Sequence, residues 1–227
     1  MDDLLRRWVD GWRRCRGLEP AIEYDDAFAV VLRLPGRDRE LFTRTDDPLV
    51  VDRIAMQARA TEDLWLTVTT QHGNEIARRL SAAGLEPFAE QNALMSIGLA
   101  DHPQPEPPAA YELTMETDGS LEYVRLLHEG DVAARGMAAI VGNDAVMHDI
   151  HTDPAHRRRG LGSVVMGALG RRGSDRGART GLLMATTEGV HLYTKLGWLP
   201  EATMVTATGS GGAGPVGGDL GAVLAGC

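Results

Sequence analysis

The sequence has few cysteines, a single lysine, few aromatic side chains and no long hydrophobic run at its start. Its two cysteines, Cys15 and Cys227, lie at opposite ends of the 227 residues, which argues against a disulfide framework and against a cysteine-based metal site. Because residues 1–8 contain no long apolar run, we expect neither a signal peptide nor a membrane span. These absences predict a soluble, cytoplasmic protein without a membrane partner.

The charge balance also restricts the function. A net charge of -9 at pH 7 disfavours general nucleic-acid binding, because attraction to phosphates dominates such affinity. The arginine-rich stretch from residue 157 to residue 179 also lacks interleaved aromatic residues, which single-strand binders use. Basic side chains do cluster locally, at Arg157, Arg158, Arg159, Arg171, Arg172, Arg176 and Arg179. A local basic patch on an acidic protein suits a small polyanion better than a duplex, although part of it is expected to be a solvated helix face.

Hydrophobic periodicity predicts a smaller N-terminal α/β domain over residues 1–100. Apolar residues recur at helical spacing over residues 3–16, and two more helices are expected at 48–60 and 74–83. Strand-like runs lie between these helices, at residues 27–34, 40–45, 64–70 and 93–99.

A proline-rich segment follows, and we place a domain boundary there, at residues 101–110. Residues 101–108 contain four prolines, which favour an extended chain and forbid a helix or a central strand. The second domain, residues 111–208, has the pattern of an antiparallel meander followed by alternating helices and strands. Its strands are predicted at 111–117, 123–128, 132–141, 145–152, 180–185 and 203–208, and its helices at 163–172 and 188–196. The glycine-rich tail, residues 209–227, is predicted to be flexible.

The two parts share a local pattern. Leu64 to Thr70, followed by a helix and Gly84-Leu85, is similar to Leu182 to Thr187, followed by a helix and Gly197-Trp198. A degenerate second half without an anion site and a chance similarity of β-α-β units both stay open.

The most informative segment is the arginine- and glycine-rich run from Asp153 to Ser163. A strand-like segment leads into it, and a helix-like segment follows it. Backbone N–H groups and the positive end of the helix dipole converge there on one point, which suits an anion. Gly160 and Gly162 let the backbone approach a ligand closely, because neither residue has a Cβ atom.

The glycine spacing separates the possible anions. A dinucleotide-binding fold requires a third glycine where this chain has Val165, and the Gly-Lys-Ser/Thr of a P-loop is missing. What remains is Arg157-Arg158-Arg159-Gly160-Leu161-Gly162, which resembles the acyl-CoA pyrophosphate loop of the GCN5-related N-acetyltransferase (GNAT) superfamily. Two flanking segments are similar to the same family: Thr152-Asp153-Pro154 to its Val-x-Pro, and Leu192 to Trp198 to its Leu-Tyr-x-x-x-Gly-Phe.

The resemblance implies a GNAT fold, an α+β arrangement in which helices flank a mixed, mostly antiparallel sheet. It also implies acetyl-CoA as co-substrate and no metal. Tyr193 matches the family's tyrosine, which is taken as the general acid that protonates the departing thiolate. Backbone N–H groups near residues 150–152 would stabilise the oxyanion. The residues expected to contact acetyl-CoA are Ile150, His151, Thr152, Arg157, Arg158, Arg159, Gly160, Leu161, Gly162, Ser163 and Thr186, the last at a position where the family often has asparagine.

The sequence identifies the general base less clearly than the general acid. His148 lies four residues before Thr152, and an imidazole suits proton transfer near neutral pH. On a regular strand His148, Ile150 and Thr152 would share one face, and Met147, Asp149 and His151 would share the other. Asp149, His151 and a water chain stay open as alternatives to His148.

One departure from the family concerns the acceptor. Only Asp118-Gly119-Ser120 separates the first two strands of the second domain, where the family usually has one or two helices that form much of the acceptor site. We therefore expect the N-terminal domain to wall the acceptor pocket, and we expect deletion of residues 1–100 to abolish acceptor turnover while acetyl-CoA binding remains. The predicted activity is acetyl transfer to a primary amine on a small molecule or peptide. A non-catalytic acyl-CoA-binding or regulatory module is the alternative, and a homodimer stays open.

Overall fold

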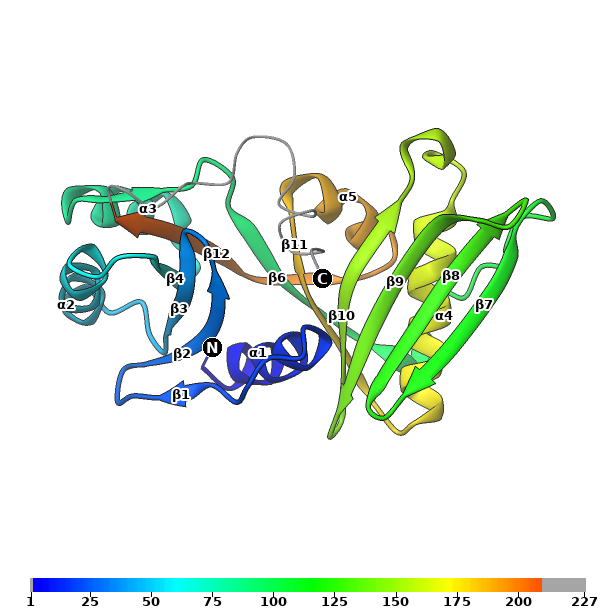
Figure 1. Ribbon diagram of the computed structural model, residues 1–227, viewed down its shortest axis with the longest axis horizontal. Helices are drawn as coiled ribbons and strands as arrows, with labels where there is room; N and C mark the ends of the chain where they lie inside the picture. Colours follow the sequence, from blue (N-terminus) through cyan, green and yellow to red (C-terminus); the bar gives the residue numbers. More distant parts are fainter. Residues whose placement is uncertain (1, 210–227) are drawn as a thin grey trace.

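The computed structural model describes residues 2–209, which form one continuous twelve-stranded sheet with helices on both faces (Figure 1). Most neighbouring strands are antiparallel, and within the described sheet β3–β4 and β10–β11 are the parallel pairs. The predicted fold class, α+β with a mixed and mostly antiparallel sheet, is therefore confirmed. The tail predicted to be flexible lies outside the described residues, apart from Gly209.

The first part of the chain contains three α-helices and six strands. The helices predicted there match the observed ones within about two residues at each end, which is the usual uncertainty of helix boundaries. The two shortest strands were not expected from the sequence. The elements are α1 (Asp2–Cys15), β1 (Ile22–Glu23), β2 (Ala27–Leu34), β3 (Arg37–Thr43), α2 (Pro48–Arg59), β4 (Leu64–Thr70), α3 (Gly73–Ala82), β5 (Leu85–Pro87), β6 (Asn92–Gly98) and the 3-10 helix η1 (Leu99–Asp101).

The second part begins with the predicted meander and continues with two helices that alternate with strands. The elements are β7 (Glu112–Asp118), β8 (Leu121–His128), β9 (Asp131–Val141), β10 (Asp144–Thr152), the 3-10 helix η2 (Pro154–His156), α4 (Leu161–Asp175), β11 (Thr180–Ala185), α5 (Thr187–Lys195) and β12 (Leu199–Gly209).

The two parts of the chain exchange strands. The sheet runs in the order β1-β2-β3-β4-β12-β6-β11-β10-β9-β8-β7, with β5 paired to β12 outside this path. Strand β6, from the first part, therefore lies between β11 and β12, and β12, the last strand, lies between β4 and β6. The proline-rich boundary thus divides the sequence without dividing the sheet.

Helix α1 covers one face of the sheet, and the other α-helices cover the opposite face. Successive residues along β10 show the alternation: Val146 belongs to the apolar cluster under α1, whereas Ala145 and Met147 belong to the cluster under α4 and α5. The same alternation along β12 places Met204 under α1 and Val205 under α2 and α3. Figure 1 shows α1 lying centrally, between the two ends of the bent sheet.

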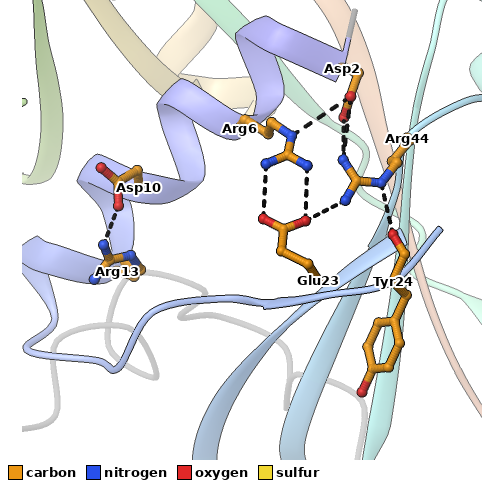
Figure 2. A network of polar contacts seen from close by, with 7 residues as sticks. All are labelled: Asp2, Arg6, Asp10, Arg13, Glu23, Tyr24 and Arg44. Atoms are coloured by element: carbon orange, nitrogen blue, oxygen red, sulfur yellow. Dashed lines mark hydrogen bonds and ion pairs between the residues drawn. The ribbon is translucent and has the colours of Figure 1, made fainter. Parts of the chain in front are cut away.

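Apolar packing and ion pairs hold α1 in this place. The stripe formed by Leu5, Trp8, Val9 and Trp12 is almost fully buried, and such burial stabilises a helix more than exposed ion pairs do. Figure 2 shows that Arg6 donates two hydrogen bonds of 2.9 Å to Glu23, which also pairs with Arg44. A further pair ties α1 to the start of β10, because Arg7 donates to both carboxylate oxygens of the buried Asp144, at 2.6 and 2.9 Å.

The proline-rich segment is packed against α4 rather than free in solvent. A Cβ atom on Gly167 of α4 would lie 2.8 Å from the carbonyl oxygen of Pro103 and 3.0 Å from Cα of Gln104, so the segment crosses the helix at a glycine. His102 is buried and accepts a 3.1 Å hydrogen bond from Nε1 of Trp198. We call residues 102–105 the strap.

None of the helices in residues 2–209 is long and apolar enough to cross a membrane.

Candidate active site

The start of α4 is open to an anion. The helix begins after Gly160 and receives no hydrogen bond from a capping side chain. In contrast, the carboxylate of Asp47 accepts from two backbone N–H groups at the start of α2, and Thr186 accepts from Gly189 at the start of α5. The first N–H groups of a helix have no partner within the helix, so an uncapped start suits a bound anion.

Two glycines shape the approach to this helix start. Gly160 has φ of 80°, a left-handed conformation that favours glycine, and a Cβ atom there would meet open space. Gly162 lies close to both neighbouring elements, since its Cβ atom would be 3.1 Å from Leu192 of α5 and 3.8 Å from Oγ1 of Thr152. The structure thus brings together the loop, the end of β10 and α5, as the sequence predicted.

The three consecutive arginines before Gly160 are exposed but not equivalent. Arg157 donates from Nε to the carbonyl oxygen of Thr152 at 3.3 Å. Arg158 has φ of 63°, which places it in the left-handed region. Arg159 donates to the hydroxyl of Tyr111 at 2.9 Å and to the carbonyl oxygen of Ala155 at 3.3 Å.

A gap opens between β10 and β11 in front of this loop. The two parallel strands pair only from Asp144 to Val146 on β10. Beyond that point β10 continues to pair with β9 as far as Thr152, and β11 pairs with β6 along its whole length. The facing edges of residues 147–152 and 183–185 therefore diverge, and we call the space between them the wedge. Its β10 edge offers backbone N–H groups to a ligand.

A β-bulge corrects the predicted alternation on β10. The pairing with β9 shifts between His148 and His151, and Asp149 within the bulge has φ of 49°. The extra residue moves Ile150 to the face of α4, where it packs with Val165, while His148 stays on the face of Val146 and α1. His148 and Ile150 therefore do not share a face, contrary to the expectation from a regular strand.

His148 lies on the α1 face in a largely buried environment. Burial and, to a smaller extent, the positive charge of Arg16 lower the pKa of its imidazole to about 4, against the opposing effect of Asp149. The side chain is therefore neutral at pH 7, and the lowered pKa makes it a weak proton acceptor there. Asp149 is engaged elsewhere, because Arg135 donates to its two carboxylate oxygens at 2.7 and 3.3 Å. His151 is exposed at the end of β10.

Tyr193 lies on α5, on the opposite side of the sheet from His148. It is 8% exposed and packs against Trp198, with the ring centroids 6.1 Å apart. Burial raises the pKa of its phenol to about 12, so the hydroxyl keeps its proton at neutral pH. Thr186 starts the same helix, and its hydroxyl accepts from the backbone N–H of Gly189 at 3.2 Å.

The sequence did not point to two other parts of this region. Tyr111, which bonds to Arg159, and Arg135, which neutralises Asp149, come from elements distant in sequence, and no local spacing connects them with the loop. Among residues 2–209, no group of three or more His, Cys, Asp or Glu side chains could hold a metal ion.

Comparisons with known proteins agree with this geometry. A family model described as the acetyltransferase (GNAT) family matches residues 91–198. No curated protein matches the chain. A GCN5-related N-acetyltransferase from Kribbella flavida has a TM-score of 0.68 at 18% identity, over 92% of this chain and 95% of that one.

Two further solved structures are similar along most of the chain. A GCN5-related N-acetyltransferase from Sphaerobacter thermophilus has a TM-score of 0.59 at 14% identity, over 90% of both chains. A tandem GNAT protein from the clavulanic acid biosynthesis pathway has a TM-score of 0.54 at 15% identity, over 80% of this chain and 82% of that one. At these identities the likeness concerns the fold, and it includes the N-terminal part.

Proposed function

We propose, from the match of residues 91–198 to the acetyltransferase (GNAT) family model, that the protein is an N-acetyltransferase that uses acetyl-CoA and a primary amine as substrates. The acceptor is a small molecule or a peptide. The same proposal places the protein in the cytoplasm and leaves a homodimer open.

One observation carries the proposal: the wedge between β10 and β11 opens beside the uncapped start of α4. On this proposal the loop from Arg157 to Ser163 binds the pyrophosphate through backbone N–H groups and positive charge. The β10 edge, from Ile150 to Thr152, binds the pantetheine arm and stabilises the oxyanion with N–H groups.

The proposed chemistry needs few side chains. The neutral amine forms a C–N bond with the acetyl carbon while the C–S bond breaks, so one proton leaves the nitrogen and one is taken up by the sulfur. Tyr193 donates to the sulfur; its phenol is protonated at neutral pH, although burial raises its pKa and so makes it a weaker acid than an ordinary tyrosine. His148 or a water accepts from the nitrogen. The bond between Asp149 and Arg135 makes Asp149 a weaker candidate for the base.

The acceptor is proposed to bind on the α1 face. Only Gly119 and Ser120 lie between β7 and β8, so no helix is inserted there. Helix α1 instead packs on β9 and β10 on the side where His148 lies. This supports the expectation that the N-terminal part walls the acceptor pocket.

The test measures binding and turnover separately. Calorimetry with acetyl-CoA gives the affinity, and CoA release over a panel of amines, peptides and aminoglycosides gives the activity. Arg158→Glu places a negative charge in the loop, and we expect about tenfold or greater loss of acetyl-CoA affinity, since hydrogen bonds to charged groups contribute about 1.5–3 kcal/mol. Arg171→Glu is the matched control, because Arg171 is also exposed on α4 but lies away from its start.

The outcomes separate the two candidate functions. Absence of acetyl-CoA binding by the wild type would refute both. The missing acceptor helices favour the alternative, a non-catalytic acyl-CoA-binding or regulatory module. That alternative is supported if acetyl-CoA binds and stabilises the protein while no acceptor gives CoA release.

A further inference from the structure

A hydrogen-bonded cluster lies directly behind the proposed pyrophosphate loop. The hydroxyl of Tyr111 is 2.9 Å from Nη1 of Arg159 and 3.0 Å from Nδ1 of His156. Tyr111 is only 7% exposed, and its ring packs against both His156 and His128. Neither Tyr111 nor His156 has a part in the proposed acetyl transfer.

The direction of each hydrogen bond follows from the number of protons. A guanidinium only donates, so the Tyr111 oxygen accepts from Arg159. The single hydroxyl proton of Tyr111 then remains for His156, and the arrangement that uses every proton of the cluster has Nδ1 of His156 accept it. His156 is consequently neutral in this arrangement, with its own proton on Nε2. If Nδ1 of His156 carried the proton, the Tyr111 oxygen would accept from both Arg159 and His156. The hydroxyl proton of Tyr111 would then have no partner in this cluster.

The cluster fixes the loop from both sides. Arg159 also donates from Nη2 to the carbonyl oxygen of Ala155, which closes the turn between η2 and α4. Tyr111 is itself held at the end of the proline-rich segment, where its backbone N–H bonds to the carbonyl oxygen of Pro108 at 2.8 Å. The hydroxyl of Tyr111 thus links the end of the proline-rich segment to His156 and Arg159, which lie 45 and 48 residues further along the chain.

We propose that Tyr111 is a positioning residue for acyl-CoA binding, which acts by engaging the donors of Arg159 and by fixing His156 as its Nε2–H tautomer. In this arrangement Arg159 shapes the loop, whereas Arg157, Arg158 and the first N–H groups of α4 bind the pyrophosphate. The inference rests on the proposed function for its ligand, but the hydrogen-bond arrangement does not.

The first experiment therefore needs no ligand. Long-range ¹H–¹⁵N NMR of the full chain, labelled at histidine and recorded at pH 8, reports the tautomer of His156. We expect an Nε2–H imidazole with a hydrogen-bonded Nδ1 in the wild type, and loss of that Nδ1 signature in Tyr111→Phe. An Nδ1–H tautomer in the wild type would overturn the arrangement.

The second experiment measures acetyl-CoA affinity and kcat. Tyr111→Phe keeps the ring and removes the hydroxyl, and we expect about fivefold weaker binding, the equivalent of one net hydrogen bond of about 1 kcal/mol. We expect kcat at saturating acetyl-CoA to be unchanged. Tyr24→Phe is the control, because Tyr24 is 48% exposed and lies on the first part of the chain.

A double-mutant cycle tests whether Arg159 acts through Tyr111. If it does, Arg159→Met weakens binding about as much as Tyr111→Phe, and the double variant is no worse than either. Additive losses would mean that Arg159 contacts acyl-CoA by itself and would overturn the proposal, as would equal affinities of wild type and Tyr111→Phe. If no variant and no wild type binds acetyl-CoA, the proposed function fails, while the NMR result still decides the arrangement.

Discussion

Replacing Gly11 with alanine tests how α1 packs on the sheet. A Cβ atom at residue 11 would lie 2.1 Å from Cγ2 and 2.3 Å from Cβ of Val146 on β10. Rotation of the Val146 side chain moves its Cγ atoms but not its Cβ atom, so the backbone of α1 or β10 must shift. Alanine gains about 1 kcal/mol of helix propensity over glycine, whereas overpacking costs about 1–3 kcal/mol. A clash with a Cβ atom, which no rotamer relieves, belongs to the upper part of that range, so we expect a net loss of about 1–2 kcal/mol.

This loss is measurable by thermal and urea unfolding. For a protein of this length it corresponds to a decrease in Tm of about 2–8 °C. Gly98→Ala is the control, because a Cβ atom at that position would have no heavy atom within 4 Å. Since α1 covers the face of His148, we also expect a higher KM for the amine with little change in acetyl-CoA affinity. Stability equal to that of the wild type would refute the close contact between α1 and β10.

Three further substitutions test the site and the strap. Tyr193→Phe is expected to lower kcat about 100-fold, the usual scale of general acid catalysis, without weakening acetyl-CoA binding; an unchanged kcat would remove Tyr193 from the mechanism. Because burial lowers the pKa of His148 from 6.5 to about 4, the neutral form contributes stability above pH 6.5 that is lost as the pH falls towards 4. Urea unfolding from pH 7 to 4 should therefore show a loss of up to about 3 kcal/mol that is absent in His148→Asn, and equal pH dependence would contradict its burial. Gly167→Ala should lower Tm by pressing on the strap carbonyl of Pro103, and more than Gly170→Ala, whose Cβ atom would be no closer than 3.3 Å to His102; equal effects would place the strap elsewhere.

Local patterns in the sequence predicted most helices and strands, and they predicted the glycine-containing loop that precedes α4. The signals for Gly160 and Gly162 are local, because a turn that opens a helix depends on adjacent residues. The bulge at Asp149 could not be predicted in this way, since an apolar–polar alternation counts residues and does not reveal an inserted one. For that reason the sequence placed His148 and Ile150 on the same face.

Sequence patterns also could not predict which strands pair when they lie far apart in the chain. Strand β6 was recognised as a strand, but its neighbours β11 and β12 lie about a hundred residues further along the chain. The same holds for Tyr111, whose partners are 45 and 48 residues away. These contacts depend on how the whole sheet packs. A short window of the sequence therefore cannot predict them.

Each part of the chain contains one parallel strand pair joined by a helix, and the starts of the two helices differ. In each, a helix connects two parallel strands: α2 between β3 and β4, and α4 between β10 and β11. The start of α2 is filled by the carboxylate of Asp47, which accepts from the N–H groups of Leu49 and Val50 and would repel a phosphate. The start of α4 has a glycine instead. The proposed donor site therefore lies in the second part, and the first part supplies α1 and β6.

Because the first part supplies a central strand of the sheet, its proposed function in acceptor binding cannot be tested by deleting it. Deletion of residues 1–100 was expected to separate donor binding from acceptor turnover, but it also removes β6 from between β11 and β12. Leu94 and Met95 of that strand are fully buried, so the deletion exposes the core on both faces of the remaining sheet. A truncated protein that failed to bind acetyl-CoA would then report lost folding. Gly11→Ala perturbs the α1 face while β6 stays in place, and it therefore tests the acceptor wall without dismantling the donor site.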